Sequence, residues 1–396
     1  MLVLCELQCV FFEHVEFNAA FIESIIKSKK YENEKIIFLA EEKHLLNVKK
    51  KLSNTKHKIY FEKINVANRN WLNYRRLVTD FFLIKKIIGF CKETEVKKII
   101  FTSVNSSILI SLKILLSFDN NTRCLAIIHG VLESIEKRPS LRPWEFFFWF
   151  KWAIKYFNRS NLQYIVLGEF IKKTLTKISP ELALYVHAID HPYIFKSEYI
   201  RDKQVNKSNT VCFGAIGVGS LQKGTNSFFK LAEELSFDKR NNKEAKFFLV
   251  GCIIDSVLKK YKTNKVYCCG NNKEIDRETF EKYLVKLDYA MFFYPPDSYK
   301  LTASGAFMDA ITWGIPIIAL KNPFFEYYFS KMGNIGYLCN DFAEIKKVVK
   351  KILEKDFSQK EYLLQRQNIL TQREIFSVNT VGNRLRQVLD NNFGGE

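Results

Sequence analysis

The chain has 396 residues, 47% of them hydrophobic, which is enough for two globular domains of ordinary size. Lysine and arginine number 61 against 42 acids, and the formal charge of +19 favours a nucleotide, nucleic acid or anionic membrane as partner. The nine cysteines contain no C-x-x-C pair, which disfavours a disulfide framework or a zinc site and indicates a reducing, cytoplasmic compartment. Residues 2–10 resemble a first strand more than a signal peptide.

The first half of the chain alternates short apolar runs with longer segments that carry apolar residues at i, i+3 and i+4. We expect strands at 2–10, 35–40, 57–61, 97–103, 124–130 and 163–168. We expect helices at 18–28, 70–93 and 106–118. This rhythm of repeated βα units predicts a parallel sheet with helices on both faces.

A polar segment at 196–210 interrupts the pattern and reads as a linker, after which the alternation restarts. Strands are expected at 210–216, 246–252, 265–270, 289–295, 315–320 and 335–339, and helices at 227–235, 279–287, 303–313, 342–355 and 377–392. The fold class expected is α/β, with two Rossmann-like doubly wound domains facing a central cleft. We place these domains at 1–195 and 196–375, with a C-terminal helix in 376–396 that packs back on the first.

The second half opens with a glycine-rich turn, GAIGVGSLQKG, between a strand and a helix. Gly219 would let backbone N–H groups approach a phosphate, and Lys223 would add a full positive charge. The spacing fits neither the P-loop nor the dinucleotide fingerprint, so neither ATP hydrolysis nor NAD is expected. An ordinary strand-to-helix turn with a surface lysine is the alternative.

A second turn of this kind lies in YKLTASGAFMDAITWGIPIIAL, residues 299–320. Ser304 and Gly305 start a predicted helix after a strand, where the helix start can hold an anion. Asp309 follows about one turn deeper and could accept hydrogen bonds from paired hydroxyls, as an acid does for ribose in dinucleotide folds. The alternative is a solvated helix acid, which the apolar neighbours of Asp309 disfavour.

Taken together, the Lys-Gly turn, the small-residue helix start, the acid-Ala pair and the Gly-x-Pro-x-x-Ala segment resemble the donor domain of GT-B glycosyltransferases. The likeness is to family 4 and its relatives in bacterial surface-polysaccharide assembly, and it covers residues 210–354. It implies that Lys223, Ser304 and Gly305 contact the diphosphate of a UDP or GDP sugar and that Asp309 binds the ribose. In CCGNNKEI, Gly270 and Asn271 would line the base.

The sequence departs from the resembled family at one position. Leu301 stands where the family has a second acid that touches the donor sugar, eight residues before Asp309. The chain also contains no D-x-D motif, so no metal is expected to bridge the diphosphate. Neither a metal nor a cofactor other than the donor is therefore expected.

The first half should hold the acceptor and any general base. Glu13 and His14 follow the first strand, where a carboxylate or imidazole could take a proton from an attacking hydroxyl if the reaction inverts. His14 could equally fill space or contact a sugar. His129 ends a strand at the place where GT-B transferases often set a histidine against the donor sugar. Glu169 lies on the same rim, or only starts the next helix.

An aromatic segment, RPWEFFFWFKWAIKYFNR at 142–159, combines rings with lysine and arginine. It reads either as a helix that docks on a membrane surface or as a core helix that covers a sheet face.

The function expected is a metal-independent glycosyltransferase that acts on a glycan or lipid-linked glycan. Its place would be the cytoplasm, with peripheral binding to the anionic inner membrane face. A nucleotide-sugar epimerase and a non-catalytic basic nucleic-acid-binding protein are the rivals. The second is disfavoured, and no nucleic-acid partner expected, because the basic residues are spread along the chain.

Overall fold

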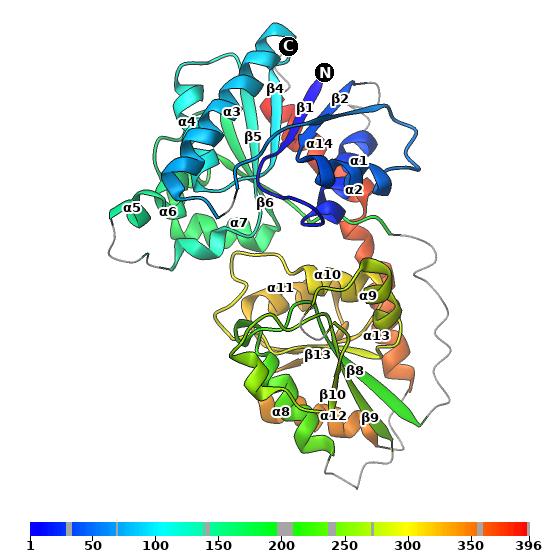
Figure 1. Cartoon of the computed structure of the whole chain (residues 1–396). Coiled ribbons are helices and arrows are strands. Elements are labelled where there is room, and N and C mark those ends of the chain that lie inside the picture. The colour runs from blue at the N-terminus through cyan, green and yellow to red at the C-terminus, as the bar shows by residue number, and fades with distance from the viewer. Residues whose placement is uncertain are drawn as a thin grey trace. The chain divides into compact units, whose positions relative to one another are not determined.

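The computed structural model describes residues 1–28, 34–68, 70–137, 139, 143–195, 209–236, 243–270, 273–354 and 359–393. The chain forms two compact units (Figure 1). The N-terminal unit comprises Met1–Ile194, Leu301–Ala303 and Ile375–Glu396, and the C-terminal unit comprises Phe195–Lys300 and Ser304–Glu374. Most of the predicted linker lies outside the described residues.

The N-terminal unit is built on a seven-stranded parallel sheet with the order β3-β2-β1-β4-β5-β6-β7. Its strands are β1 (Leu2–Glu6), β2 (Ile36–Ala40), β3 (Ile59–Lys63), β4 (Lys98–Ser103), β5 (Arg123–Ile128), β6 (Leu162–Leu167) and β7 (Val186–Ile189). All six predicted strands are present, and β7 was missed because His187 interrupts its short apolar run. The first strand ends at Glu6, earlier than predicted, because the Glu6 carboxylate accepts the N–H groups of Gln8 and Cys9.

Helices cover both faces of this sheet (Figure 1). They are α1 (Val15–Lys27), α2 (Glu42–Lys51), α3 (Asn73–Glu93), α4 (Ser106–Ser117), α5 (Pro143–Phe147), α6 (Phe150–Lys155), α7 (Glu169–Ile178) and α14 (Val378–Phe393). Sequence patterns missed α2, which buries only three side chains, while the helix expected to follow Glu169 is α7. The C-terminal helix α14 packs against α1 at Gly382, where a Cβ atom would lie 2.6 Å from the carbonyl oxygen of Ser24.

One hydrophobic core joins β1, β2 and β5 to α1, α2 and α14. Alternate strand residues such as Leu2, Leu4, Ile36 and Phe38 point into it and are fully buried. Because the strands are covered on both faces, their intervening residues are buried as well, which explains the continuous apolar runs in the sequence.

The C-terminal unit has a six-stranded parallel sheet with the order β10-β9-β8-β11-β12-β13. Its strands are β8 (Thr210–Ile216), β9 (Glu244–Val250), β10 (Val266–Cys268), β11 (Tyr289–Phe292), β12 (Ile317–Leu320) and β13 (Gly336–Cys339). Its helices are α8 (Thr225–Ser236), α9 (Arg277–Leu284), α10 (Gly305–Thr312), α11 (Pro323–Met332), α12 (Phe342–Leu353) and α13 (Gln359–Gln372). Each of the six predicted strands is present, and the sequence patterns missed α11 and α13.

The aromatic segment does not form the single helix that the sequence suggested. It forms two short helices, α5 and α6, because Trp149 adopts an extended backbone between them and its indole N–H donates to the Ser134 carbonyl at 2.8 Å. Arg142 lies outside the described residues. Among the described helices, none is long and apolar enough to cross a bilayer. The nine cysteines are free thiols, most of them buried.

Candidate functional site

Each sheet has a switch point, where the strand order reverses, between β1 and β4 in the N-terminal unit and between β8 and β11 in the C-terminal unit. In open α/β sheets, ligands bind outside the carboxyl ends of the strands at such a point. The topology of each unit therefore marks one edge of its sheet as a candidate ligand site.

At the C-terminal switch point, Lys223 meets the turn after β8 and the start of α10. A small pocket there is lined by Ile216 at the end of β8, by Lys223 and by Tyr294 just after β11. A Cβ atom placed on Gly217 would lie 3.8 Å from Nζ of Lys223 and 3.9 Å from Cβ of Ala306. The structure thus gathers a lysine, a glycine turn and a helix start within one small volume.

The ammonium group of Lys223 is half-buried and has no carboxylate partner among the described residues. Burial lowers its pKa, and the nearby Cys252 thiol opposes the shift. Placing a cation in a partly dry site without a counter-charge is costly, and a bound anion would offset that cost. Lys223 therefore has the surroundings of an anion-binding residue.

Two of the glycines at this edge of the sheet use their N–H groups in internal hydrogen bonds. They therefore define the shape of the turn and do not offer these N–H groups to a ligand. The N–H of Gly219 donates to the Cys252 carbonyl at 2.9 Å, and that of Gly270 donates to the Gly251 carbonyl at 2.8 Å. Gly224, directly after Lys223, has φ of 65°, and a Cβ there would lie 2.1 Å from the carbonyl oxygen of Phe293. The predicted Gly219 and Gly270 thus set the turn geometry, while Asn271 lies outside the described residues.

Ser304 and Gly305, both predicted as site residues, have different roles at the start of α10. Ser304 is the N-cap: its Oγ accepts the Phe307 N–H at 3.2 Å and lies 3.0 Å from the Tyr294 hydroxyl, so the side chain is used internally. Gly305 is exposed, with open space where a side chain would stand. A ligand can therefore reach the N–H groups of Gly305 and Ala306 in the first turn of α10, which have no partner within the helix.

Asp309 lies on α10 and is 8% exposed, so it is not the solvated helix acid of the alternative interpretation. Its Oδ1 accepts a hydrogen bond from Arg277 Nη1 at 3.0 Å, and Arg277 Nε donates to Glu281 at 2.7 Å. Arg277 could not be predicted from sequence, because no local pattern links it to Asp309, 32 residues away. Leu301 is buried, and its N–H donates to the Glu133 carboxylate at 3.2 Å within the N-terminal unit.

At the N-terminal switch point lies Glu6, a residue that the sequence analysis did not single out. The side chain is fully buried, and its oxygens accept from the Gln8 and Cys9 N–H groups and from Asn18 at 3.2 Å. The hydroxyls of Thr102 and Ser103, at the end of β4, also donate to it. Burial raises the pKa of Glu6, but the neighbouring His14 and these hydrogen bonds outweigh it and lower the pKa overall.

His14, which lies beside Glu6, forms a cluster with two further histidines. The rings of His14 and His129 stack with centroids 3.9 Å apart, and His191, which was not predicted, lies 5.5 Å from His129. Burial and the other imidazoles hold the pKa of His129 well below its usual range, and burial lowers that of His191 to about 4. Both are neutral near pH 7, and Nδ1 of His129 is buried with no hydrogen-bond partner among the described residues.

The remaining predicted residues lie at the rim. Glu13 is exposed in the turn before α1, and Glu169 is the exposed first residue of α7. Glu6, Cys9 and His14 place their ligand atoms within 4.8 Å of one another, close enough to surround a metal ion. Both oxygens of Glu6 are already taken by five hydrogen bonds, however, so this set fits an internal polar network better than a metal site.

Two Rossmann-like units, each with a parallel sheet and helices, match the GT-B fold of solved structures and confirm the predicted α/β class. A scan against protein-family models finds no match, and neither does a search of curated proteins.

Several solved structures are similar to this chain over nearly its whole length. A glycosyltransferase from Rickettsia africae ESF-5 is 14% identical, with 100% of this chain and 99% of that one covered and a TM-score of 0.64. Sucrose-phosphate synthase from Thermosynechococcus elongatus is 12% identical, with 100% and 99% covered and a TM-score of 0.67. Anabaena HepE in complex with UDP-glucose is 14% identical, with 99% and 100% covered and a TM-score of 0.64. At these identities the likeness establishes the fold.

Proposed function

We propose that this protein is a glycosyltransferase that moves a sugar from a nucleoside-diphosphate sugar, of UDP or GDP type, to a glycan or lipid-linked glycan. The observation that carries the proposal is Lys223, a half-buried cation with no carboxylate partner among the described residues, set beside a glycine turn and the start of α10. Support comes from structures of the same fold, which include HepE with UDP-glucose and WaaG, involved in lipopolysaccharide biosynthesis.

In the proposed reaction, the C-terminal unit binds the leaving group. As the bond between the sugar and the diphosphate breaks, negative charge grows on the outer phosphate. The ammonium of Lys223 and the first-turn N–H groups of α10 would stabilise that charge, because they are fixed in place before the reaction begins. We therefore propose that transfer proceeds without a metal ion.

The N-terminal unit would supply the groups that meet the sugar and the acceptor. His129 is neutral near pH 7, so it would hydrogen-bond a sugar hydroxyl as an imidazole and not as a cation. His14 and Glu13 stay the candidates for a base. Glu6 would act as a positioning residue, because it holds the loop that carries His14. We place the reaction at the inner membrane face, where a lipid-linked acceptor would be found.

The decisive test is the affinity of the Lys223→Ala variant for UDP and GDP, measured by calorimetry. Hydrogen bonds to charged groups contribute about 1.5 to 3 kcal/mol, so we expect the affinity for the preferred nucleotide to fall by about ten- to a hundredfold. The melting temperature without nucleotide should change little or rise, since the variant removes a half-buried charge.

Lys230→Ala is the matched control. Lys230 lies on α8 close to Lys223 in sequence, is exposed, and pairs with Glu234 at 3.9 Å. This variant should bind nucleotide as the unaltered protein does. Equal nucleotide affinity in Lys223→Ala and Lys230→Ala would refute the proposed site.

A further inference from the structure

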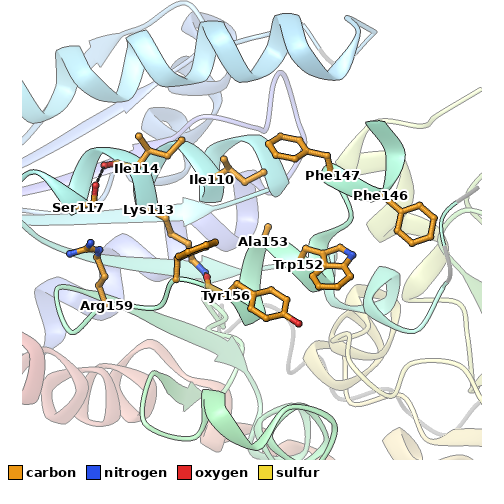
Figure 2. A pocket seen from close by; sticks show the side chains of 11 residues that line it. Ile110, Lys113, Ile114, Ser117, Phe146, Phe147, Trp152, Ala153, Tyr156 and Arg159 are labelled. Atoms are coloured by element: carbon orange, nitrogen blue, oxygen red, sulfur yellow. Dashed lines mark hydrogen bonds between the residues drawn. The ribbon is translucent and has the colours of Figure 1, made fainter. Parts of the chain in front are cut away.

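The N-terminal unit contains an apolar pocket whose lining residues do not belong to the switch-point cluster. It lies between α4 and the α5–α6 segment and has a volume of about 730 Å³, within the usual range for ligand pockets. Figure 2 shows Ile110 and Ile114 of α4 along one wall, with Trp152 and Tyr156 across from them. Apolar and aromatic side chains dominate the lining, so a ligand rich in polar atoms would lose hydrogen bonds on entering.

The rim of this pocket exposes large rings. Phe157 is 86% exposed, Phe147 57% and Trp152 43%. Phe157 also has φ of 55°, a backbone conformation in which glycine or asparagine is ordinary and a bulky residue is strained. Neither burial nor backbone preference explains a phenylalanine at this position, so its ring points to an interaction outside the folded chain.

The floor of the pocket is held by Lys113 from α4. Its ammonium donates to the carbonyls of Ile154 and Tyr156 and to Oδ1 of Asn158 at 2.9 Å, which uses all three of its N–H bonds. Burial lowers the pKa of Lys113 to about 7. Lys113 is therefore a positioning residue that fixes the turn bearing Phe157, and it is not free to bind a ligand.

The charge at the rim is positive. Arg159 lines the pocket, is exposed, and has no ion pair among the described residues. Lys151 lies over the Trp149 ring at 5.1 Å, while Lys155 pairs with Glu181 at 3.4 Å. Rings beside cations suit the boundary between lipid headgroups and hydrocarbon. A second copy of the chain is a poor occupant, because each copy has a formal charge of +19 and the two would repel.

We propose that this pocket receives a hydrocarbon chain of an anionic membrane phospholipid, with the headgroup phosphate at Arg159 and the Phe157 ring inserted beside it. The pocket would thus anchor the N-terminal unit on a membrane surface. This inference rests on the proposed function, which makes a membrane the partner, and it identifies the part of the protein that contacts the membrane. It involves none of the residues proposed to bind nucleotide.

The test is flotation of the full chain with vesicles of phosphatidylglycerol and phosphatidylethanolamine, compared with vesicles of phosphatidylcholine alone. We expect binding to the anionic vesicles only. Phe157→Gly removes the ring and relieves the positive φ, so the variant should melt no lower than the parent but bind about tenfold more weakly. Arg159→Glu should also weaken vesicle binding, although it leaves every aromatic ring in place.

Phe11→Gly is a closely matched control, since Phe11 has φ of 52°, is 49% exposed, and does not line the pocket. It should leave vesicle binding unchanged. Phospholipids brominated along their acyl chains should quench tryptophan fluorescence, and Trp152→Phe should remove most of that quenching. Headgroup adsorption alone would leave the fluorescence unquenched and would overturn the proposal.

Two other results would also overturn it: equal vesicle binding by Phe157→Gly and Phe11→Gly, or no binding by the parent chain. If Phe157→Gly instead converts a dimer into a monomer in sedimentation while vesicle binding stays the same, the surface is a protein interface. The nucleotide-induced thermal shift of each variant separates this inference from the proposed function. Loss of vesicle binding with a retained shift supports both, and vesicle binding without any shift in the parent refutes only the nucleotide site.

Discussion

The two switch points have the same topology, but the charged side chain at each one has a different set of partners. In the N-terminal unit, the buried carboxylate of Glu6 accepts hydrogen bonds from two backbone N–H groups, an amide and two hydroxyls. In the C-terminal unit, Lys223 has no carboxylate partner among the described residues and faces a glycine turn. The charge at the N-terminal edge is therefore satisfied by hydrogen bonds within the protein, whereas the charge at the C-terminal edge has no counter-charge among the described residues.

The difference indicates which unit needs a ligand to complete its electrostatics. A buried charge with a full set of hydrogen bonds orders its surroundings and gains little from an added ion. A partly buried cation without a partner gains directly from an anion. The C-terminal edge should therefore be stabilised by a nucleotide, while the N-terminal edge should respond mainly to protons through its histidines.

We expect the largest effect at Gly224, where the turn of the C-terminal unit leaves no room for a side chain. Alanine at Gly224 would place Cβ 2.1 Å from the Phe293 carbonyl oxygen and force φ of 65° on a residue with a side chain. We expect Gly224→Ala to lower the free energy of unfolding by about 3 to 5 kcal/mol, measured by urea denaturation. Nucleotide affinity should fall too, because Lys223 precedes this residue.

Gly333→Ala isolates the clash from the backbone strain. Gly333 lies in the same unit with φ of 76° but has no atom within 4 Å of an added Cβ. Because its backbone (φ 76°, ψ −147°) lies in a region that residues with a side chain rarely adopt, the alanine variant should lose about 1 to 3 kcal/mol from backbone strain alone. Similar losses in the two variants would mean that the turn is not tightly packed against β11, contrary to the structure.

The next effect concerns the acid of the same edge. If Asp309 accepts hydrogen bonds from ribose, Asp309→Asn should weaken UDP binding by about ten- to a hundredfold but weaken binding of a dideoxyribose analogue much less. Calorimetry with both nucleotides measures this difference. Equal losses would show that Asp309 acts only by holding Arg277.

Glu281→Gln provides the comparison for that experiment. It removes the other acid that contacts Arg277, at 2.7 Å, while leaving Asp309 unchanged. UDP and its dideoxy analogue should then differ in affinity as they do for the parent chain. A lost preference in Glu281→Gln would shift the ribose contact from Asp309 to the Arg277 network.

The sequence predicted most strands of both sheets and offered candidates for the C-terminal edge, whose ligand binding stays a prediction. Strands buried on both faces leave continuous apolar runs, and a lysine or a serine directly before a glycine stands out after such a run. Lys223, Ser304 and Gly305 were found in this way. The short β7 was missed because His187 breaks the apolar run in VHAI, whereas β11 to β13, which are equally short, contain no such interruption.

The N-terminal edge was harder to predict because its parts are far apart in the sequence. Glu6, Ser103, His129 and His191 come from four segments that only the parallel sheet brings together. An acid inside the apolar run LVLCELQCV was the available signal for Glu6, since an acid in a buried strand needs partners. The partners themselves could not be read from spacing, and the same holds for Arg277 and Asp309.

The smallest of these effects tests the N-terminal edge through pH. All six histidines precede residue 192, and burial lowers the pKa of His191 from 6.5 to about 4. Below pH 6.5 the unfolded chain binds a proton that the folded chain refuses, so stability falls as pH falls. Between pH 7.5 and pH 5, His191 should account for a loss of about 2 kcal/mol.

His191→Phe keeps an aromatic ring beside Phe17 and His129 but removes the titration. The variant should therefore lose about 2 kcal/mol less than the parent over this pH range. Hydrogen exchange of strand amides follows each unit separately, and the effect should be confined to β1 to β7. Other titrating groups, such as Asp80 with its pKa raised by burial to about 6, are common to both chains and cancel in the difference. An identical pH dependence in parent and variant would mean that His191 has the same pKa in the folded and the unfolded chain, which would contradict its burial as a neutral imidazole.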